Sequence, residues 1–153
     1  MNREAIYSAL FALVNTSAMQ KANGGQFNTI TRRPQLWNQY NSADMPVLGM
    51  VEIRETYQWP SGSATPAKAT LKGEFWIYTN IGEDKNVIPS TLLNNCIDAV
   101  EASIQPSPPR PLARQTLGGL VAECVFDGEI MKAPGYTDGI GMAVIPFTII
   151  VPA

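Results

Sequence analysis

The fold is decided by the C-terminal stretch at residues 115–152, QTLGGLVAECVFDGEIMKAPGYTDGIGMAVIPFTIIVP. It contains two nearly continuous apolar runs, residues 117–130 and 141–151, with a loop around Pro134 and Gly135 between them. Runs of this kind are typical of central strands that are covered on both faces. We therefore expect a closing hairpin that holds the C-terminal segment in a sheet, flanked by loops that are too long to be simple turns.

Two further β-rich segments, residues 47–58 and 68–79, are expected to pair as an antiparallel hairpin. Apolar side chains alternate along one face of each segment. They are Val51, Ile53 and Tyr57 on the first segment and Leu71, Phe75 and Ile77 on the second.

The opposite faces of these two segments carry charges that help to choose the register. Pairing Glu52 with Lys72 is favourable, and so is pairing Arg54 with Glu74. We do not expect the register in which Arg54 faces Lys72, because like charges directly opposite each other are destabilising.

Two amphipathic helices are expected to pack on the sheet. Asn2 can cap the first helix, and Pro89 suits the first turn of the second. The apolar stripes are Ile6, Leu10, Leu13, Val14 and Ala18 in the first helix, and Leu92, Leu93, Cys96, Ile97, Val100 and Ile104 in the second. The expected fold class is α+β: a single domain over residues 1–153, with a mainly antiparallel β-sheet, long hairpins and two packed α-helices.

Three shorter segments connect these elements. Residues 27–33 alternate and stop at Pro34, which predicts a short edge strand. Residues 36–46 mix large aromatic residues with turn formers, so we expect an ordered loop that Trp37 anchors in the core. The proline-rich residues 106–111, PSPPRP, predict a stiff surface connector rather than a recognition peptide.

The composition argues against several classes of function. The chain of 153 residues is long enough for one domain, and only 16% of its residues are charged, which suggests that other subunits cover part of its surface. A net charge of −2 argues against tight nucleic-acid binding. Histidine is absent, which removes the commonest general acid/base and the usual nitrogen ligand of zinc. The apolar run at residues 5–14 is too short for a membrane span and lacks the flanks of a signal peptide.

Carboxylates are the remaining candidates for chemistry. Glu83 and Asp84 have the composition of a solvated turn, and the spacing around them does not supply the further oxygen ligands that a divalent cation needs. Asp127 and Glu129 would point to the same side of an extended strand, about 7 Å apart. That pair leaves a carboxylate-dependent hydrolase as the enzymatic alternative, but we expect no enzyme activity, no metal and no cofactor.

Two pairs of residues have a structural interpretation. Cys96 and Cys124 show no metal-binding spacing and are predicted to be buried thiols. Gly118 and Gly119 are not followed by the Gly-Lys-Ser/Thr of a phosphate loop, so they predict a β-bulge or a close backbone approach.

Several short motifs follow one another in a recognisable order. They are FNTITRR at residues 27–33, Trp37, PVL at 46–48, Glu52, the second helix at 92–104, QTLGG at 115–119, GEI at 128–130 and IPF at 145–147. Over most of its length the chain thereby resembles the tail terminator, or tail completion, proteins of long-tailed bacteriophages. The most specific motif is QTLGG before an apolar hairpin.

The resemblance implies a structural virion protein without a catalytic role. Typically six copies would form a ring that caps the finished tail tube, ends its polymerisation and provides the surface for head attachment. The implied partners are further copies of the chain, the tail tube protein and the neck or head-completion proteins, with DNA passing through the ring without specific binding and no membrane involved. The implied location is the neck region of the virion tail, after assembly in the host cytoplasm. The alternative is another neck or head-completion protein of the head–tail connector.

The same hypothesis suggests where the subunits or the tube make contact. The candidates are Trp59 and Pro60 at the hairpin tip, Pro134, Gly135 and Tyr136 in the closing loop, and Arg32 and Arg33 after the edge strand. For Trp59 the alternative is that its ring folds back on its own hairpin. The two arginines could gather with Arg110 and Arg114 into a basic patch that either meets acidic residues of another subunit or is solvated.

Overall fold

The centre of the molecule is a pair of long strands, β3 (Lys68–Asn80) and β6 (Ile140–Pro152). They are antiparallel over their whole lengths. The computed structural model of the chain describes residues 1–106 and 113–152. The sheet has six strands, and the other four are β2 (Val47–Gln58) on the far side of β3, β1 (Thr29–Thr31) beside β2, and β4 (Glu123–Phe126) and β5 (Met131–Ala133) beside β6. The sheet is mixed because the edge strand β1 runs parallel to β2.

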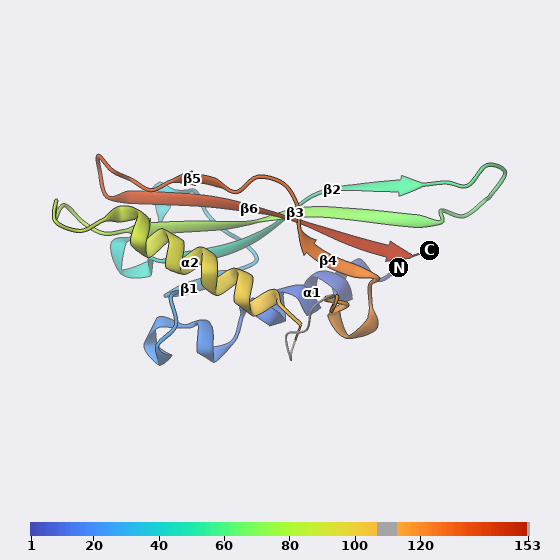
Figure 1. The fold of residues 1–153 in the computed structure, drawn as a ribbon, viewed down its shortest axis with the longest axis horizontal. Helices are drawn as coiled ribbons and strands as arrows, with labels where there is room; N and C mark the ends of the chain where they lie inside the picture. Colours follow the sequence, from blue (N-terminus) through green and yellow to red (C-terminus); the bar gives the residue numbers. More distant parts are fainter. Residues whose placement is uncertain (107–112, 153) are drawn as a thin grey trace.

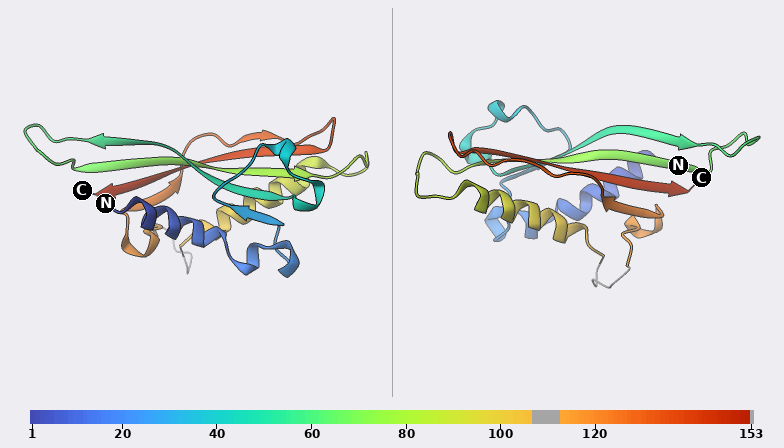
Figure 2. Two further views of the ribbon diagram at one scale, coloured as in Figure 1. Left: turned by 180° about the vertical axis from the view of Figure 1, so that it is seen from behind. Right: turned by 45° about the horizontal axis from the view of Figure 1, so that its top comes forward.

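Both helices lie on the same face of this sheet (Figures 1 and 2). Helix α1 (Arg3–Val14) begins after Asn2, whose side-chain oxygen accepts a hydrogen bond of 3.1 Å from the Ala5 backbone N–H. Helix α2 (Pro89–Ile104) begins with the proline that the sequence predicted for its first turn. The α+β class with two helices packed on a largely antiparallel sheet is confirmed.

The hydrophobic core fills the space between the helices and the sheet. Alternate residues of the two central strands are buried there: Leu71, Phe75, Ile77, Ile145, Phe147 and Ile149. The ring centroids of Phe75 and Phe147 are 5.1 Å apart. Gly73 makes room for this packing, because a Cβ there would lie 2.3 Å from the Phe147 ring. Burying one side chain of this size stabilises the fold by about 1.5–3 kcal/mol.

The register between β2 and β3 differs from the prediction. Glu52 lies opposite Gly73, and Arg54 lies opposite Lys72, because Ile53 is an extra residue that forms a β-bulge. Glu52, just before the bulge, lies on the helix side because it pairs with Gly73. The bulge reverses the alternation of the residues that follow it, so Val51 and Tyr57 lie on opposite faces. The like charges are tolerated because Lys72 reaches the carboxylate of Asp127 at 3.7 Å.

The expected single strand at residues 117–130 is also wrong. Leu117–Gly119 form a 3-10 turn, the strand β4 spans four residues, and a bend at residues 127–130 separates it from β5. Gly118 and Gly119 are needed for their left-handed backbone (φ 71° and 89°), not for a close approach, because a Cβ at either would meet nothing within 4 Å. The long apolar run therefore becomes two short edge strands on β6.

A loop at residues 34–46 covers one part of the helix-free face. Tyr40 anchors it, with its ring centroid 5.9 Å from that of Tyr78 and its hydroxyl accepting a hydrogen bond from the Gln35 backbone N–H. The prediction that Trp37 is the anchor is wrong, since 46% of this residue is exposed. The predicted connector at residues 106–111 lies, apart from Pro106, outside the described residues.

The molecule is elongated, and different segments form the two ends of its long axis (Figure 1). At one end the β2–β3 hairpin extends beyond both helices and turns at residues 59–67. At the other end lie the β3–α2 loop, residues 81–88, and the β5–β6 loop, residues 134–139. We call these the hairpin end and the loop end.

Candidate functional site

The hairpin end presents Trp59 and Pro60 to solvent. Trp59 is 58% exposed, so more than half of its surface does not fold back on its own hairpin. Within residues 1–106 and 113–152, the hydrogen bonds of this turn are local: the Ala67 N–H donates to the Gln58 carbonyl (2.8 Å), and the Ser63 N–H donates to the Pro60 carbonyl (3.1 Å). The tip is therefore an exposed aromatic residue on a projecting, locally supported turn.

The charge at this end is simple. Within residues 58–69 of the sequence, Lys68 is the only charged side chain. The tip thus combines an amphipathic aromatic ring with a weakly positive base, and tryptophan is one of the residue types enriched among the hot spots of protein interfaces.

The loop end is built differently, because its two loops are joined through their backbones. The Ile81 N–H donates to the Gly139 carbonyl (3.0 Å). A Cβ at Gly139 would lie 2.2 Å from the Gly82 carbonyl oxygen, so only glycine allows the two loops to approach this closely. Gly135 is also in the left-handed region (φ 87°), and the N–H of Gly139 donates to its carbonyl. The loop end is held in one arrangement by these contacts.

Between the two loops lies an open hollow of about 960 Å³. Three large apolar side chains are exposed around it: Val87, Ile88 at 63% and Tyr136 at 72%. Of the candidates in the closing loop, Tyr136 is thus exposed, whereas Pro134 and Gly135 are half-buried. Val87 and Ile88 were missed in the sequence, although an apolar pair placed just before Pro89 and outside the helix stripe is a usable signal.

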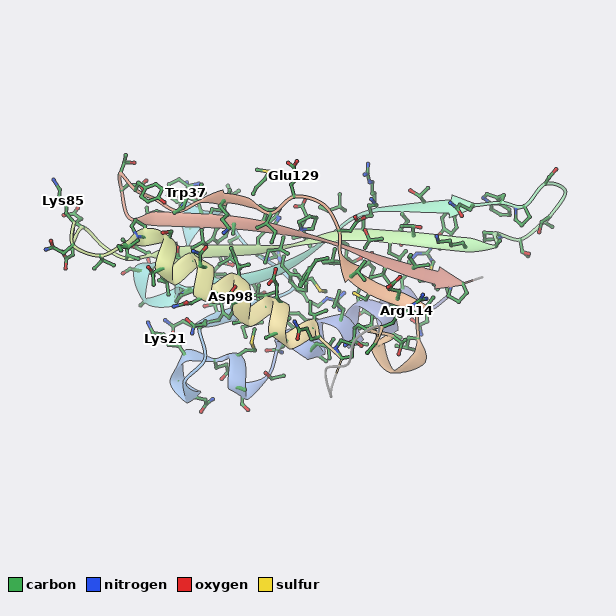
Figure 3. The ribbon with its side chains drawn as sticks, in the orientation of Figure 1. Lys21, Trp37, Lys85, Asp98, Arg114 and Glu129 are labelled. Carbon is green, nitrogen blue, oxygen red and sulfur yellow. The ribbon has the colours of Figure 1, made fainter. Side chains whose placement is uncertain are left out.

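The hollow has an acidic rim. Glu83, Asp84 and Asp138 line it together with one cation, Lys85, which Figure 3 places at the outer end of the molecule. Asp84 accepts a hydrogen bond from the Asn86 N–H (2.9 Å), and Asp138 accepts one from the Ile140 N–H (3.0 Å). Two of the three rim carboxylates, Asp84 and Asp138, therefore also order the loops.

The structure does not bring the two sets of aromatic candidates together. The β2–β3 turn, which carries Trp59, and the β5–β6 loop, which carries Tyr136, lie at opposite ends of the long axis (Figure 1). One copy of the chain therefore cannot bring its hairpin tip to its own hollow.

The arginine candidates separate as well. Arg32 bridges α1 and β2, with salt bridges to Glu4 at 2.6 Å and Glu52 at 2.9 Å. Its hydrogen bond lowers the pKa of Glu4, with a further contribution from the Ser8 hydroxyl. Arg33 is exposed, and its backbone N–H donates a hydrogen bond to the Thr31 hydroxyl. Arg32 thus stabilises the fold of its own subunit. The sequence predicted instead that it either meets acidic residues of another subunit or is solvated.

Of the other two arginines of the suggested basic patch, Arg110 lies outside the described residues. Arg114 is exposed on the segment that leads into the Leu117–Gly119 turn (Figure 3). A second ionic cluster, also missed in the sequence, ties Arg3 to Glu55 (2.7 Å) and to the hydroxyl of Tyr57. The hydrogen bond from Arg3 lowers the pKa of Glu55. This cluster attaches the start of α1 to the base of the hairpin.

The carboxylate pair of the hydrolase alternative is not on an extended strand. Gly128, at φ 115°, bends the chain between β4 and β5, so the expected spacing of Asp127 and Glu129 does not apply. Asp127 accepts a hydrogen bond from the Thr148 hydroxyl (3.0 Å), whereas Glu129 is exposed on the helix-free side (Figure 3). Within residues 1–106 and 113–152, His, Cys, Asp and Glu form no cluster of three or more that could hold a metal ion.

The two cysteines are buried, as predicted, and are not joined in a disulfide. Burial raises the pKa of each thiol, Cys96 and Cys124, to about 12. Both therefore act as small apolar core residues rather than as nucleophiles at neutral pH.

In the described part of the chain, none of the helices has the length and hydropathy that a membrane crossing requires. Comparisons with protein-family models and with curated proteins find no match to this chain.

Proposed function

We propose that the protein is a tail terminator of a long-tailed bacteriophage, a structural subunit whose copies form a ring on the end of the tail tube. The ring ends polymerisation of the tube and offers the surface to which the head attaches. The observation that carries this proposal is the pair of exposed surfaces at the two ends of one elongated subunit.

Closed assemblies of identical subunits need two different, complementary patches on each copy, unless the contact is a symmetric dimer. The hairpin end and the loop end meet this requirement. Both are displayed by a body whose core is covered by two helices, so the subunit keeps its shape while its ends make contacts. The motif order described above directs the proposal to the tail tube.

The charge balance supports a channel through which DNA slides. A chain with a net charge of −2 does not attract phosphates overall, and Arg32 is neutralised by two carboxylates of its own subunit. DNA would then pass through the ring without being held.

Tube growth in vitro tests the proposal. Purified tail tube protein is polymerised with and without this protein, and tube lengths are measured by electron microscopy. We expect shorter tubes with one end capped, at substoichiometric amounts of the protein. Unchanged lengths and bare tube ends would reject the assignment, and binding to a portal or neck complex instead would favour the head-side alternative.

A further inference from the structure

We propose that the hairpin tip of one copy docks in the hollow at the loop end of the next copy, which makes the subunit contact a heterologous, head-to-tail one. The inference deepens the proposed function and rests on it for the ring, whereas the contact itself is a property of the purified chain. The occupant of the hollow is a segment of a second copy, residues 58–68.

The shapes of the two surfaces match. The tip is a narrow projection with Trp59 and Pro60 at its start. The hollow is open, about 960 Å³ in volume, and bordered by Val87, Ile88 and Tyr136. An aromatic anchor surrounded by apolar side chains that exclude water is the arrangement in which a few residues supply most of the binding energy.

The charges match as well. The tip carries no acidic residue, and Lys68 stands at its base. The hollow is lined by three carboxylates and one ammonium group. Opposite potentials steer two such surfaces together and disfavour contacts of a surface with its like, tip against tip or hollow against hollow.

The rigidity of the hollow and the adaptability of the tip also suit a docking contact. The backbone contact of Gly139 with Gly82 fixes the loops before binding, so the hollow loses little conformational entropy when it is occupied. In the described part of the chain, the tip is hydrogen-bonded only within its own turn and to the end of β2, which leaves it free to adapt. A contact of this kind, repeated from copy to copy, closes into a ring when the rotation between neighbours divides a full turn, and otherwise gives an open helical filament.

Mixing two variants tests the pairing. Trp59→Ala removes the aromatic anchor of the tip and leaves the hollow intact. Ile88→Ser removes an apolar side chain of the hollow and leaves the tip intact. Ile88 precedes the first residue of α2, where serine is a preferred capping residue, so Ile88→Ser does not disfavour the helix. Trp37→Ala and Ile53→Ser are the matched controls, because both residues are exposed but lie outside the two surfaces.

Sedimentation velocity and native mass spectrometry of the full-length chain give the readout. We expect each variant alone to lose about tenfold or more in its association constant and the controls to behave as wild type. An equimolar mixture of the two variants should form heterodimers and no larger assembly. The intact tip of Ile88→Ser then occupies the intact hollow of Trp59→Ala, and the surfaces that remain free are both altered. Wild-type assembly by both variants, or a mixture that forms no heterodimer, would overturn the inference.

A cross-link covers the case in which the contact is weak in solution. Ser61→Cys on one population and Glu83→Cys on another are mixed at high concentration with a mild oxidant. The native thiols, buried and with the pKa of each raised to about 12, do not compete. We expect Ser61→Cys to cross-link faster to Glu83→Cys than to a control, Asn23→Cys, which lies on an exposed turn at the helix side. Equal rates, or no mixed dimer, would refute the contact.

Cross-linking without tube capping would instead refute the tail terminator function and leave the proposed contact between subunits unaffected.

Discussion

The two ends of the molecule are held in different ways. The loops at residues 81–88 and 134–139 are joined backbone to backbone, through the Ile81–Gly139 hydrogen bond and a contact that only glycine permits. Among the residues that the structure describes, the turn at residues 59–67 has hydrogen bonds only to itself and to the strand ends that carry it. Exposed apolar residues are thus displayed on two kinds of backbone. The backbone of the loop end is fixed before binding, whereas the backbone of the hairpin end can adapt to a partner.

The largest effect is expected from the core, on which both ends depend. Phe75→Ala should lower the free energy of unfolding by about 3–5 kcal/mol, because Phe75 is fully buried and packs against Phe147. Urea unfolding followed by circular dichroism measures the loss. A loss below about 1 kcal/mol would mean that the body is not the rigid frame that separates the two ends.

A pair of glycines compares the two ends directly. Gly139 and Gly62 share a φ of +76°, but a Cβ at Gly139 would lie 2.2 Å from a carbonyl oxygen, whereas one at Gly62 would meet nothing within 4 Å. Gly139→Ala should therefore cost about 2–4 kcal/mol, and Gly62→Ala, which adds only backbone strain, about 1 kcal/mol. Equal losses in thermal unfolding would show that the loop end is no more rigidly packed than the tip.

The ionic cluster at the base of the hairpin predicts a smaller, pH-dependent effect. Because Arg3 lowers the pKa of Glu55, the stabilisation is fully present above the ordinary pKa of 4.5 and is lost as the pH falls through the lowered value. Glu55→Gln should thus be less stable than wild type at neutral pH, and the difference should disappear once the pH has fallen below the lowered pKa of Glu55.

Thermal melts across this pH range give the comparison for Glu55→Gln. The control is Glu83→Gln at the loop end, because Glu83 has no ion pair among residues 1–106 and 113–152. A difference between wild type and Glu55→Gln that persists in acid would contradict the ionic cause.

The smallest effect on stability is expected at the tip itself. Trp59→Ala should change the free energy of unfolding by no more than about 0.5 kcal/mol, since the ring is largely exposed, while it impairs assembly. Calorimetry and native mass spectrometry on the same preparation measure both quantities. A large loss of thermal stability with normal assembly would restore the alternative in which Trp59 protects its own hairpin.

Regular periodicity made much of the fold predictable. The stripe of Leu93, Cys96, Ile97 and Val100 fixed the position of α2, and the capping residue Asn2 fixed the start of α1. The errors fall where one residue changes the geometry. The bulge at Ile53 reverses the faces of β2, and the bend at Gly128 divides an apolar run, yet neither residue type marks its position unambiguously in a sequence.

The candidate site was predicted in part for a related reason. Trp59 and Tyr136 were found because large aromatic residues in loops stand out, and both are exposed. Arg32 was misjudged because its partners Glu4 and Glu52 are distant in the sequence and meet it only after folding. The hollow also could not be predicted, since it depends on two loops that are joined by Ile81 and Gly139, which lie 58 residues apart in the sequence.

Electron cryomicroscopy of tail tubes grown with this protein tests the central claim most directly. The account predicts a closed ring of identical copies on one end of each tube, with residues 58–68 of every copy seated against residues 81–89 and 134–139 of its neighbour. Bare tube ends, or a single copy bound without a ring, would contradict it.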